Sequence, residues 1–123
     1  MKVHTAINNA FTELKKNNIK SALLDCEILM AQAIKKNREF VILNSNQKIE
    51  KKSYSYFKKL VNERSKGKPI AYIIGKKAFW KYEFLINEKV LIPRPDTETI
   101  IEEVLKLYKY KDKINLLEIG VGS

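Results

Sequence analysis

The chain has 123 residues, 45% of them hydrophobic, which is enough for one packed domain or a small domain plus part of another and excludes global disorder. It carries 24 Lys and Arg against 14 Asp and Glu, and the net charge of +10 suits either a well-solvated surface or an RNA or acidic protein partner. The sequence shows no signal peptide and no apolar run of membrane-spanning length, so we expect a cytoplasmic protein without membrane contacts.

Two amphipathic helices are predicted first. Residues 3–17 gather apolar side chains on one face and end at Asn17-Asn18. Ser21 is the expected N-cap of the second helix, with Asp25 and Glu27 near its positive end. We expect the apolar stripe of the second helix to consist of Leu24, Ile28, Ala31 and Ile34.

Cysteine and histidine each occur once. Cys26 lies among apolar residues at helical spacing, which predicts a small buried thiol in a reduced compartment rather than a nucleophile. His4 has no clustered Cys or Asp beside it, so we expect no metal site.

The next segment predicts a third long helix and completes a basic bundle. A short apolar turn at 38–43 and a loop at 44–46 lead to a helix over 48–66. Its expected inward residues are Tyr54, Phe57, Leu60 and Val61, and its expected outward residues are Lys51, Lys52, Lys58 and Lys59. Gly67 suits a left-handed residue after the last turn. Residues 1–75 therefore read as a small helical bundle, and residues 1–60 alone hold 12 basic and 5 acidic residues.

The sequence becomes aromatic and β-prone after Gly75. The stretch KKAFWKYEFLI predicts two short strands with a tight turn near Lys81, followed by a turn at Asn87-Glu88. In the following stretch, VLIPRPDTE, two prolines flank Arg94 and stiffen the backbone.

A helix is predicted after these prolines and runs to about Tyr110. Asp96, Thr97 and Glu98 fall in its first turn, where side-chain oxygens can accept bonds from free N–H groups. Residues 114–119 then read as a strand that is apolar on both faces, a pattern typical of a parallel sheet covered by helices on both sides. We therefore expect residues 90–123 to open an α/β domain whose remainder is missing.

The chain ends in a glycine loop with the sequence Glu118-Ile-Gly-Val-Gly-Ser123. Glycines after a strand let the backbone approach a nucleotide or nucleoside closely. The pattern is short, so a simple strand-end turn remains an alternative to a cofactor loop. The loop has no Lys of the phosphate-binding type, which argues against a nucleoside triphosphatase.

Several segments in order resemble the release-factor glutamine methyltransferases (HemK/PrmC type). They are SALLDCEILMAQAI, GKPIAYIIG followed by FW, LIPRPDTE and LLEIGVGS, and together they cover essentially the whole chain. Two positions depart from the family pattern, which usually has Asp at Glu118 and a small residue at Val121. The family's Asn-Pro-Pro-Tyr motif does not occur in the sequence, so the chain resembles an N-terminal, truncated portion of such an enzyme.

The resemblance implies a mostly α fold in three parts. Residues 1–75 would be a helical substrate-docking domain, 76–92 a β-hairpin connector, and 93–123 the truncated start of an α/β, Rossmann-like S-adenosylmethionine methyltransferase domain. The parent enzyme would methylate the glutamine side-chain amide of peptide chain release factors.

The resemblance also assigns a binding site but no catalytic residue within 1–123. The implied cofactor contacts are Gly120, Val121, Gly122 and Ser123, supported by Glu118. The implied lip of the site is Pro93, Arg94, Pro95, Asp96, Thr97 and Glu98, for which a helix cap with a stiff linker is the structural alternative. This fragment alone is expected to be inactive and to bind S-adenosylmethionine weakly or not at all.

Two other functions remain open on the sequence. The basic bundle could be a stand-alone binding module, or the chain could be a fragment of a nucleic-acid adenine amino-methyltransferase. PRPDTE favours the release-factor enzyme, so the expected partner is a release factor rather than nucleic acid. We also expect an unpaired apolar strand at 114–119 to favour self-association.

Overall fold

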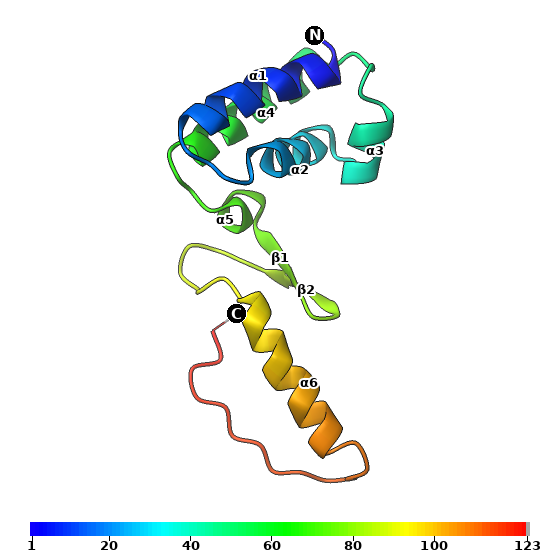
Figure 1. Ribbon diagram of the computed structural model, residues 1–123, viewed down its shortest axis with the longest axis vertical. Coiled ribbons are helices and arrows are strands. Elements are labelled where there is room, and N and C mark those ends of the chain that lie inside the picture. The colour runs from blue at the N-terminus through cyan, green and yellow to red at the C-terminus, as the bar shows by residue number, and fades with distance from the viewer. Residues whose placement is uncertain (123) are drawn as a thin grey trace. The chain divides into compact units, whose positions relative to one another are not determined.

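The computed structural model describes residues 1–122, which form two compact units, Met1–Ile74 and a second unit that begins at Gly75 (Figure 1). The helices of the first unit are α1 (Val3–Lys16), α2 (Ala22–Ile34), α3 (Arg38–Leu43), α4 (Lys51–Ser65) and α5 (Ile70–Ile74). The second unit holds the strands β1 (Lys76–Phe79) and β2 (Tyr82–Leu85), the 3-10 turn η1 (Pro95–Thr97) and helix α6 (Glu98–Leu107). The predicted helical N-terminal region followed by a β-hairpin is confirmed.

The core of the first unit is built where α1, α2 and α4 pack together. Leu14 of α1, Leu29 and Met30 of α2, and Phe57 of α4 are at most 1% exposed. Burying a side chain of this size contributes roughly 1.5–3 kcal/mol relative to leaving it in water. The predicted inward residues of α4 are confirmed, because Phe57, Leu60 and Val61 are buried and Tyr54 packs against the core.

The buried face of α2 agrees with the predicted stripe at Ala31, which is buried, and at Ile34, which packs against the core, but not at Leu24. Leu24 is 43% exposed, whereas the buried apolar residues are Ala22, Cys26, Leu29, Met30, Ala31 and Ala33. Because α2 packs against α1, α3, α4 and α5, it is apolar on several sides and its hydrophobic pattern does not define one face. Ser21 occupies the predicted N-cap position, but its hydroxyl donates to Asp25 Oδ2 at 3.0 Å instead of capping the helix.

A buried ion pair joins α2 to the end of α4. Arg64 Nε donates to Asp25 Oδ2 at 2.7 Å, and the two side chains are only 16% and 4% exposed. Arg64 Nη1 also donates to the carbonyl oxygen of Lys68 at 3.0 Å. Between these residues Gly67 has the predicted left-handed conformation, with φ of +91°. The pair therefore sets the rotation of α2 about its axis and anchors the chain where it leaves α4.

Helix α4 starts later than the predicted residue 48. Lys48 instead forms an isolated antiparallel bridge with Lys2, and the Ile49 N–H donates to the Met1 carbonyl oxygen at 3.0 Å. Pairing with the start of the chain keeps these residues extended, so Glu50 becomes the residue before the helix.

The short helix α5 was not predicted. Ala71 is buried, and the residues that pack around it against the core of the first unit are Ile70, Ile73 and Ile74. Isoleucine has lower helix propensity than leucine or alanine, so the three isoleucines of this segment did not indicate a helix in the sequence. Pro69 directly before Ile70 is a helix-start signal, because proline suits the first helical turn.

The hairpin matches its prediction, with Trp80 and Lys81 forming the turn. The strands pair antiparallel from Phe79↔Tyr82 to Lys76↔Leu85. Alternation along the strands places Lys77, Phe79, Tyr82 and Phe84 on one face. The Phe79 and Phe84 rings meet edge-on with centroids 5.9 Å apart. Lys76 and Glu83 form an ion pair at 3.1 Å on the opposite face.

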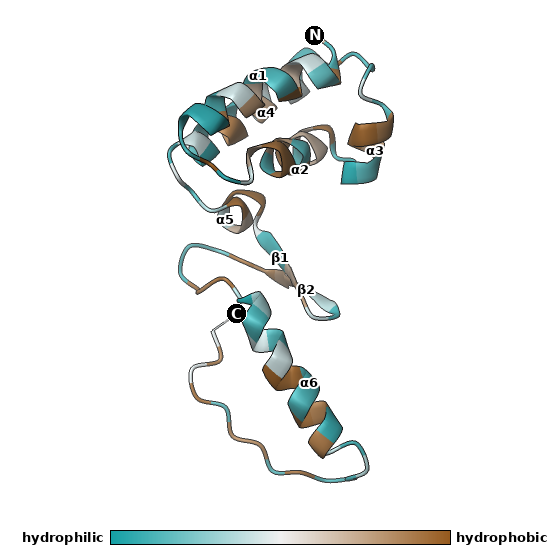
Figure 2. Ribbon diagram, viewed as in Figure 1, coloured by the Kyte–Doolittle hydropathy of each residue, from teal (hydrophilic) through white to brown (hydrophobic). Residues whose placement is uncertain are grey.

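Helix α6 is amphipathic but buries none of its residues. Hydrophobic and hydrophilic residues alternate around it (Figure 2), yet Ile100 is 64% and Leu107 is 73% exposed. The helix ends at Leu107 rather than at the predicted Tyr110. None of the helices in residues 1–122 combines the length and the apolar character needed to cross a membrane.

The predicted strand at 114–119 is wrong. These residues have no regular secondary structure, and Leu116, Leu117 and Ile119 are 67%, 86% and 89% exposed. A strand is stabilised by hydrogen bonds to a neighbouring strand. Within residues 1–122 the named strands are β1 and β2, which pair with each other and not with this segment. The expected start of a Rossmann-like sheet is therefore not present in the described residues.

Replacing Arg64 by Ala is expected to destabilise the chain by about 3–5 kcal/mol, because it leaves the Asp25 carboxylate buried without its partner. Urea unfolding followed by far-UV circular dichroism measures the loss. Arg38→Ala is the matched control, since Arg38 binds Glu27 at 2.7 Å but is 47% exposed. That change should cost about 1 kcal/mol or less. Equal losses in the two variants would contradict the role given to the buried pair.

Backbone amides of residues 114–119 are expected to exchange with solvent at nearly the rate of an unstructured peptide. Their side chains are exposed and they have no regular secondary structure, whereas the amides around Phe57 and Leu60 lie in the core and should exchange slowest. Hydrogen exchange followed by NMR measures both regions. Strong protection across Leu116–Ile119, in a sample shown by sedimentation to be monomeric, would contradict this expectation.

Candidate functional site

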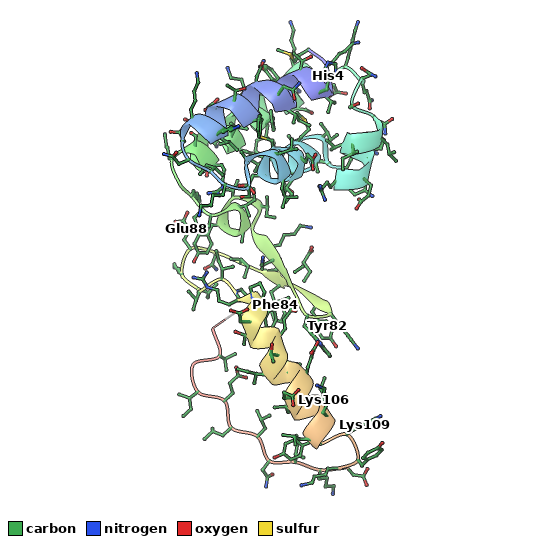
Figure 3. All side chains as sticks on the ribbon, viewed as in Figure 1. His4, Tyr82, Phe84, Glu88, Lys106 and Lys109 are labelled. Atoms are coloured by element: carbon green, nitrogen blue, oxygen red, sulfur yellow. The ribbon has the colours of Figure 1, made fainter. Side chains whose placement is uncertain are left out.

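The single histidine and the single cysteine of the chain, His4 and Cys26, both lie in the first unit. Among residues 1–122 no group of three or more His, Cys, Asp or Glu side chains could hold a metal ion. His4 lies at the start of α1 (Figure 3), with its Nδ1 3.2 Å from the Ser45 carbonyl oxygen. Burial, reinforced by the nearby carboxylates of Asp25, Glu13 and Glu27, raises the pKa of Cys26 to about 12. The prediction of a buried thiol is confirmed, because Cys26 is 0% exposed. With its raised pKa the thiol stays protonated at neutral pH.

A cavity of about 520 Å³ lies in the second unit. The hairpin supplies Phe79 and Phe84 to its lining, and the glycine loop supplies Gly120 and Gly122. Thr97 and Ile101, from η1 and the first turn of α6, also line it. Small-molecule sites in proteins commonly have volumes in this range and linings that are mainly apolar and aromatic.

The cavity brings together most of the residues that were predicted as cofactor contacts and as the lip of the site. Those that line it are Glu118, Gly120, Val121, Gly122, Pro93, Arg94 and Thr97. Pro95 and Asp96 do not line it, nor does Glu98, whose carboxylate binds elsewhere. Ser123 lies outside the described residues.

Five residues that line the cavity were not predicted as site residues. They are apolar or aromatic: Phe79, Phe84, Leu91, Ile92 and Ile101. The alternation of the hairpin contained the signal for two of them, because Phe79 and Phe84 occupy the same face. Figure 3 shows Phe84 and Tyr82 projecting from the hairpin, and Tyr82 is 66% exposed.

The glycine loop has the backbone conformation that glycine permits. Gly120 and Gly122 have φ of +76° and +73°, in the left-handed region that residues with a Cβ rarely adopt. Val121, between them, is 66% exposed, so the loop is open to solvent. An open loop of this kind can offer backbone groups to a ligand, and Glu118 adds a carboxylate to the lining of the cavity.

Glu98 acts differently from the predicted helix cap. Asp96, Thr97 and Glu98 do lie in the turn that leads into α6, but neither η1 nor α6 has a side-chain cap bond. Glu98 Oε1 instead accepts a hydrogen bond of 2.7 Å from the backbone N–H of Trp80, 18 residues earlier. The carboxylate therefore ties the start of α6 to the turn of the hairpin.

The basic surface of the first unit includes one helix side rich in lysine. The four residues Lys51, Lys52, Lys58 and Lys59 of α4 are all exposed, as predicted. Between α1 and α4 lies a groove of about 360 Å³, and Lys58 lines it together with Asn9, Glu13 and Asn62. This surface can attract an acidic partner through long-range electrostatics.

Comparison with known proteins places the chain beside one family. The model of the PrmC N-terminal domain matches residues 5–75. A release factor glutamine methyltransferase from Leptospira interrogans is 40% identical over 111 residues, covering 89% of this chain and 39% of that protein. Its counterpart from Clostridium acetobutylicum is 35% identical over 123 residues, covering 100% and 43%. The counterpart from Shewanella oneidensis is 32% identical over 118 residues, covering 96% and 41%. The chain thus spans about two-fifths of the length of these relatives.

Proposed function

Since this chain belongs to the PrmC N-terminal domain family, we propose that it is the N-terminal part of a methyltransferase that modifies the glutamine side-chain amide of peptide chain release factors. The observation that carries the proposal is the cavity in the second unit. It is lined by the glycine loop and by part of the PRPDTE segment, two motifs that the sequence links to this family.

The residues around the cavity fit S-adenosylmethionine as a cofactor. The volume of about 520 Å³ is large enough for its nucleoside part. The space beside Gly120 is open, because a Cβ placed on this residue would meet no other atom within 4 Å. Gly120, Val121 and Gly122 would offer backbone polar groups to the cofactor. Phe79 and Phe84 would give it an apolar, aromatic wall.

For methyl transfer to a glutamine amide, this chain would help to align the amide with the methyl donor rather than activate it chemically. When bound, S-adenosylmethionine supplies an electrophilic methyl group. The amide nitrogen of glutamine is a poor nucleophile, because its lone pair is delocalised into the carbonyl. Holding the amide in line with that methyl group is therefore the main task, and proximity can supply a large part of the rate. The family resemblance assigns the holding of the substrate amide to an Asn-Pro-Pro-Tyr motif, which residues 1–123 do not contain. These residues would therefore contribute binding and positioning.

The helical unit would dock the release factor. Its core is complete within Met1–Ile74, so it can present a fixed surface. The exposed lysines of α4 lie on the side opposite its buried residues Phe57, Leu60 and Val61. Long-range attraction from such a surface raises association rates and is screened by salt.

The chain alone is expected to bind S-adenosylmethionine only weakly and to transfer no methyl group. Its glycine loop is open to solvent, and small-ligand affinity depends on deep burial of the ligand. An NMR titration to millimolar S-adenosylmethionine should shift the signals of Gly120, Gly122 and Phe84, and Gly122→Val should reduce those shifts. Calorimetry showing 1:1 binding at micromolar affinity would contradict the expected weakness. The absence of shifts at these residues would refute the assigned site.

Reversing the charge of Lys51, Lys52, Lys58 and Lys59 to Glu is expected to slow association with a class I release factor by about tenfold at low salt, and by less at moderate salt. Surface plasmon resonance measures the rates. The matched control reverses four exposed lysines of the second unit, Lys89, Lys109, Lys111 and Lys113, with the same change in net charge. Tighter binding to RNA than to the release factor, or equal slowing in both variants, would contradict docking through α4.

A further inference from the structure

We propose that Glu98 is a positioning residue, whose carboxylate holds the turn of the hairpin and thereby keeps the aromatic wall of the cavity in place. The proposal rests on the proposed function only for the ligand that the cavity receives. The hold itself is a property of the ligand-free chain and can be tested there.

The turn that Glu98 binds is strained by its own sequence. Trp80 has φ of +51°, in the left-handed region, where a bulky side chain is unfavourable and where hairpin turns normally place Gly or Asn. Such a conformation persists when the surrounding structure favours it, and strained residues of this kind gather at functional sites. The turn therefore needs a contact from outside the two strands.

Glu98 supplies that contact. The strand pairing ends at Phe79↔Tyr82, which leaves Trp80 in the turn, beyond the last pair. Glu98 Oε1 accepts from the Trp80 N–H at 2.7 Å, a short bond in which the acceptor carries charge. Bonds of this type are about twice as strong as those between neutral groups.

The same bond connects the turn to the cavity. Phe79 precedes Trp80, and its ring meets the Phe84 ring edge-on with the ring centroids 5.9 Å apart. The positions of both aromatic rings therefore depend on the geometry of the turn. Thr97, which precedes Glu98, lines the cavity too. Glu98 itself does not line the cavity, so it acts on the site through Trp80.

The indole side chain stabilises the tip without replacing this bond. Lys81 Nζ lies 4.7 Å from the centroid of the Trp80 ring, and the Tyr82 ring is 6.0 Å away. These contacts hold side chains of the turn against one another. They do not link the turn to α6, whereas the Glu98 carboxylate does so through its hydrogen bond with the Trp80 N–H.

The test compares Glu98→Ala, Glu98→Gln and the control Glu102→Ala in the full chain. Glu102 lies one turn further along α6 and is exposed. Two NMR readouts serve: the exchange rate of the Trp80 amide hydrogen and the cross-peaks between the Phe79 and Phe84 rings. Glu98→Ala should raise the exchange rate by about tenfold or more, as expected for losing a hydrogen bond to a charged group, and weaken the cross-peaks. Glu98→Gln keeps an acceptor oxygen and should restore much of both, while Glu102→Ala should change neither.

A second pair of variants covers the case in which Glu98→Ala disorders the whole hairpin. Trp80→Gly keeps the backbone N–H but removes the strain, because glycine adopts positive φ freely. In the Trp80→Gly background, Glu98→Ala should therefore leave the hairpin ordered, as judged by cross-strand signals between Lys77 and Phe84. A hairpin that stays disordered in the double variant would overturn the proposal. Wild-type exchange and ring contacts in Glu98→Ala, or equal changes in Glu102→Ala, would also overturn it.

Titration with S-adenosylmethionine separates this proposal from the proposed function. Glu98→Ala should reduce the shifts at Gly120 and Gly122 at least threefold at the same ligand concentration, and Glu98→Gln should restore them in part. If the wild-type chain shows no shifts, the cofactor assignment fails while the positioning role is decided by the ligand-free measurements. If the wild type responds and Glu98→Ala responds equally, the positioning role fails and the cofactor assignment stands.

Discussion

The buried pair between Asp25 and Arg64 is the interaction on which the first unit depends. A carboxylate that is 4% exposed is tolerated only because a guanidinium and a hydroxyl satisfy it, so the side of α2 that carries Asp25 must face Arg64. In this orientation of α2, Cys26, Leu29 and Met30 face the core and Leu24 is 43% exposed. Through the carbonyl of Lys68, the same arginine also fixes where the chain departs from α4 toward α5.

The two units differ in whether their apolar surfaces find partners. In the first unit, the apolar residues of α1, α2 and α4 cover one another, and the lysines of α4 face outward. In the second unit, α6 and residues 114–119 expose Ile100, Leu107, Leu117 and Ile119 to water. Surfaces of this kind mark places where a protein contacts further structure.

Local patterns in the sequence predicted the elements well and their surroundings less well. The helical face of α4, the left-handed Gly67 and the hairpin turn at Trp80-Lys81 each depend on a few neighbouring residues, and each is found. The orientation of α2, the start of α4 and the bond between Glu98 and Trp80 depend on residues far away in the chain, so periodicity and capping rules could not identify them. The prediction of a strand at 114–119 was wrong for the same reason, because a strand needs a neighbouring strand to hydrogen-bond with and the local pattern does not show whether one is present.

The candidate site shows the same division. The glycine motif and the proline-flanked Arg94, which the family resemblance singled out, both contribute lining residues to the cavity. Its apolar wall came from the hairpin and from Leu91, Ile92 and Ile101, whose convergence depends on the fold.

The hairpin also carries Trp80, which is the single tryptophan of the chain, whereas the longest helices lie in the first unit. Tryptophan fluorescence therefore reports the second unit and far-UV ellipticity mainly reports the first. Two optical signals of one sample can thus reveal whether the units unfold together, the condition under which a single free energy of unfolding describes the chain.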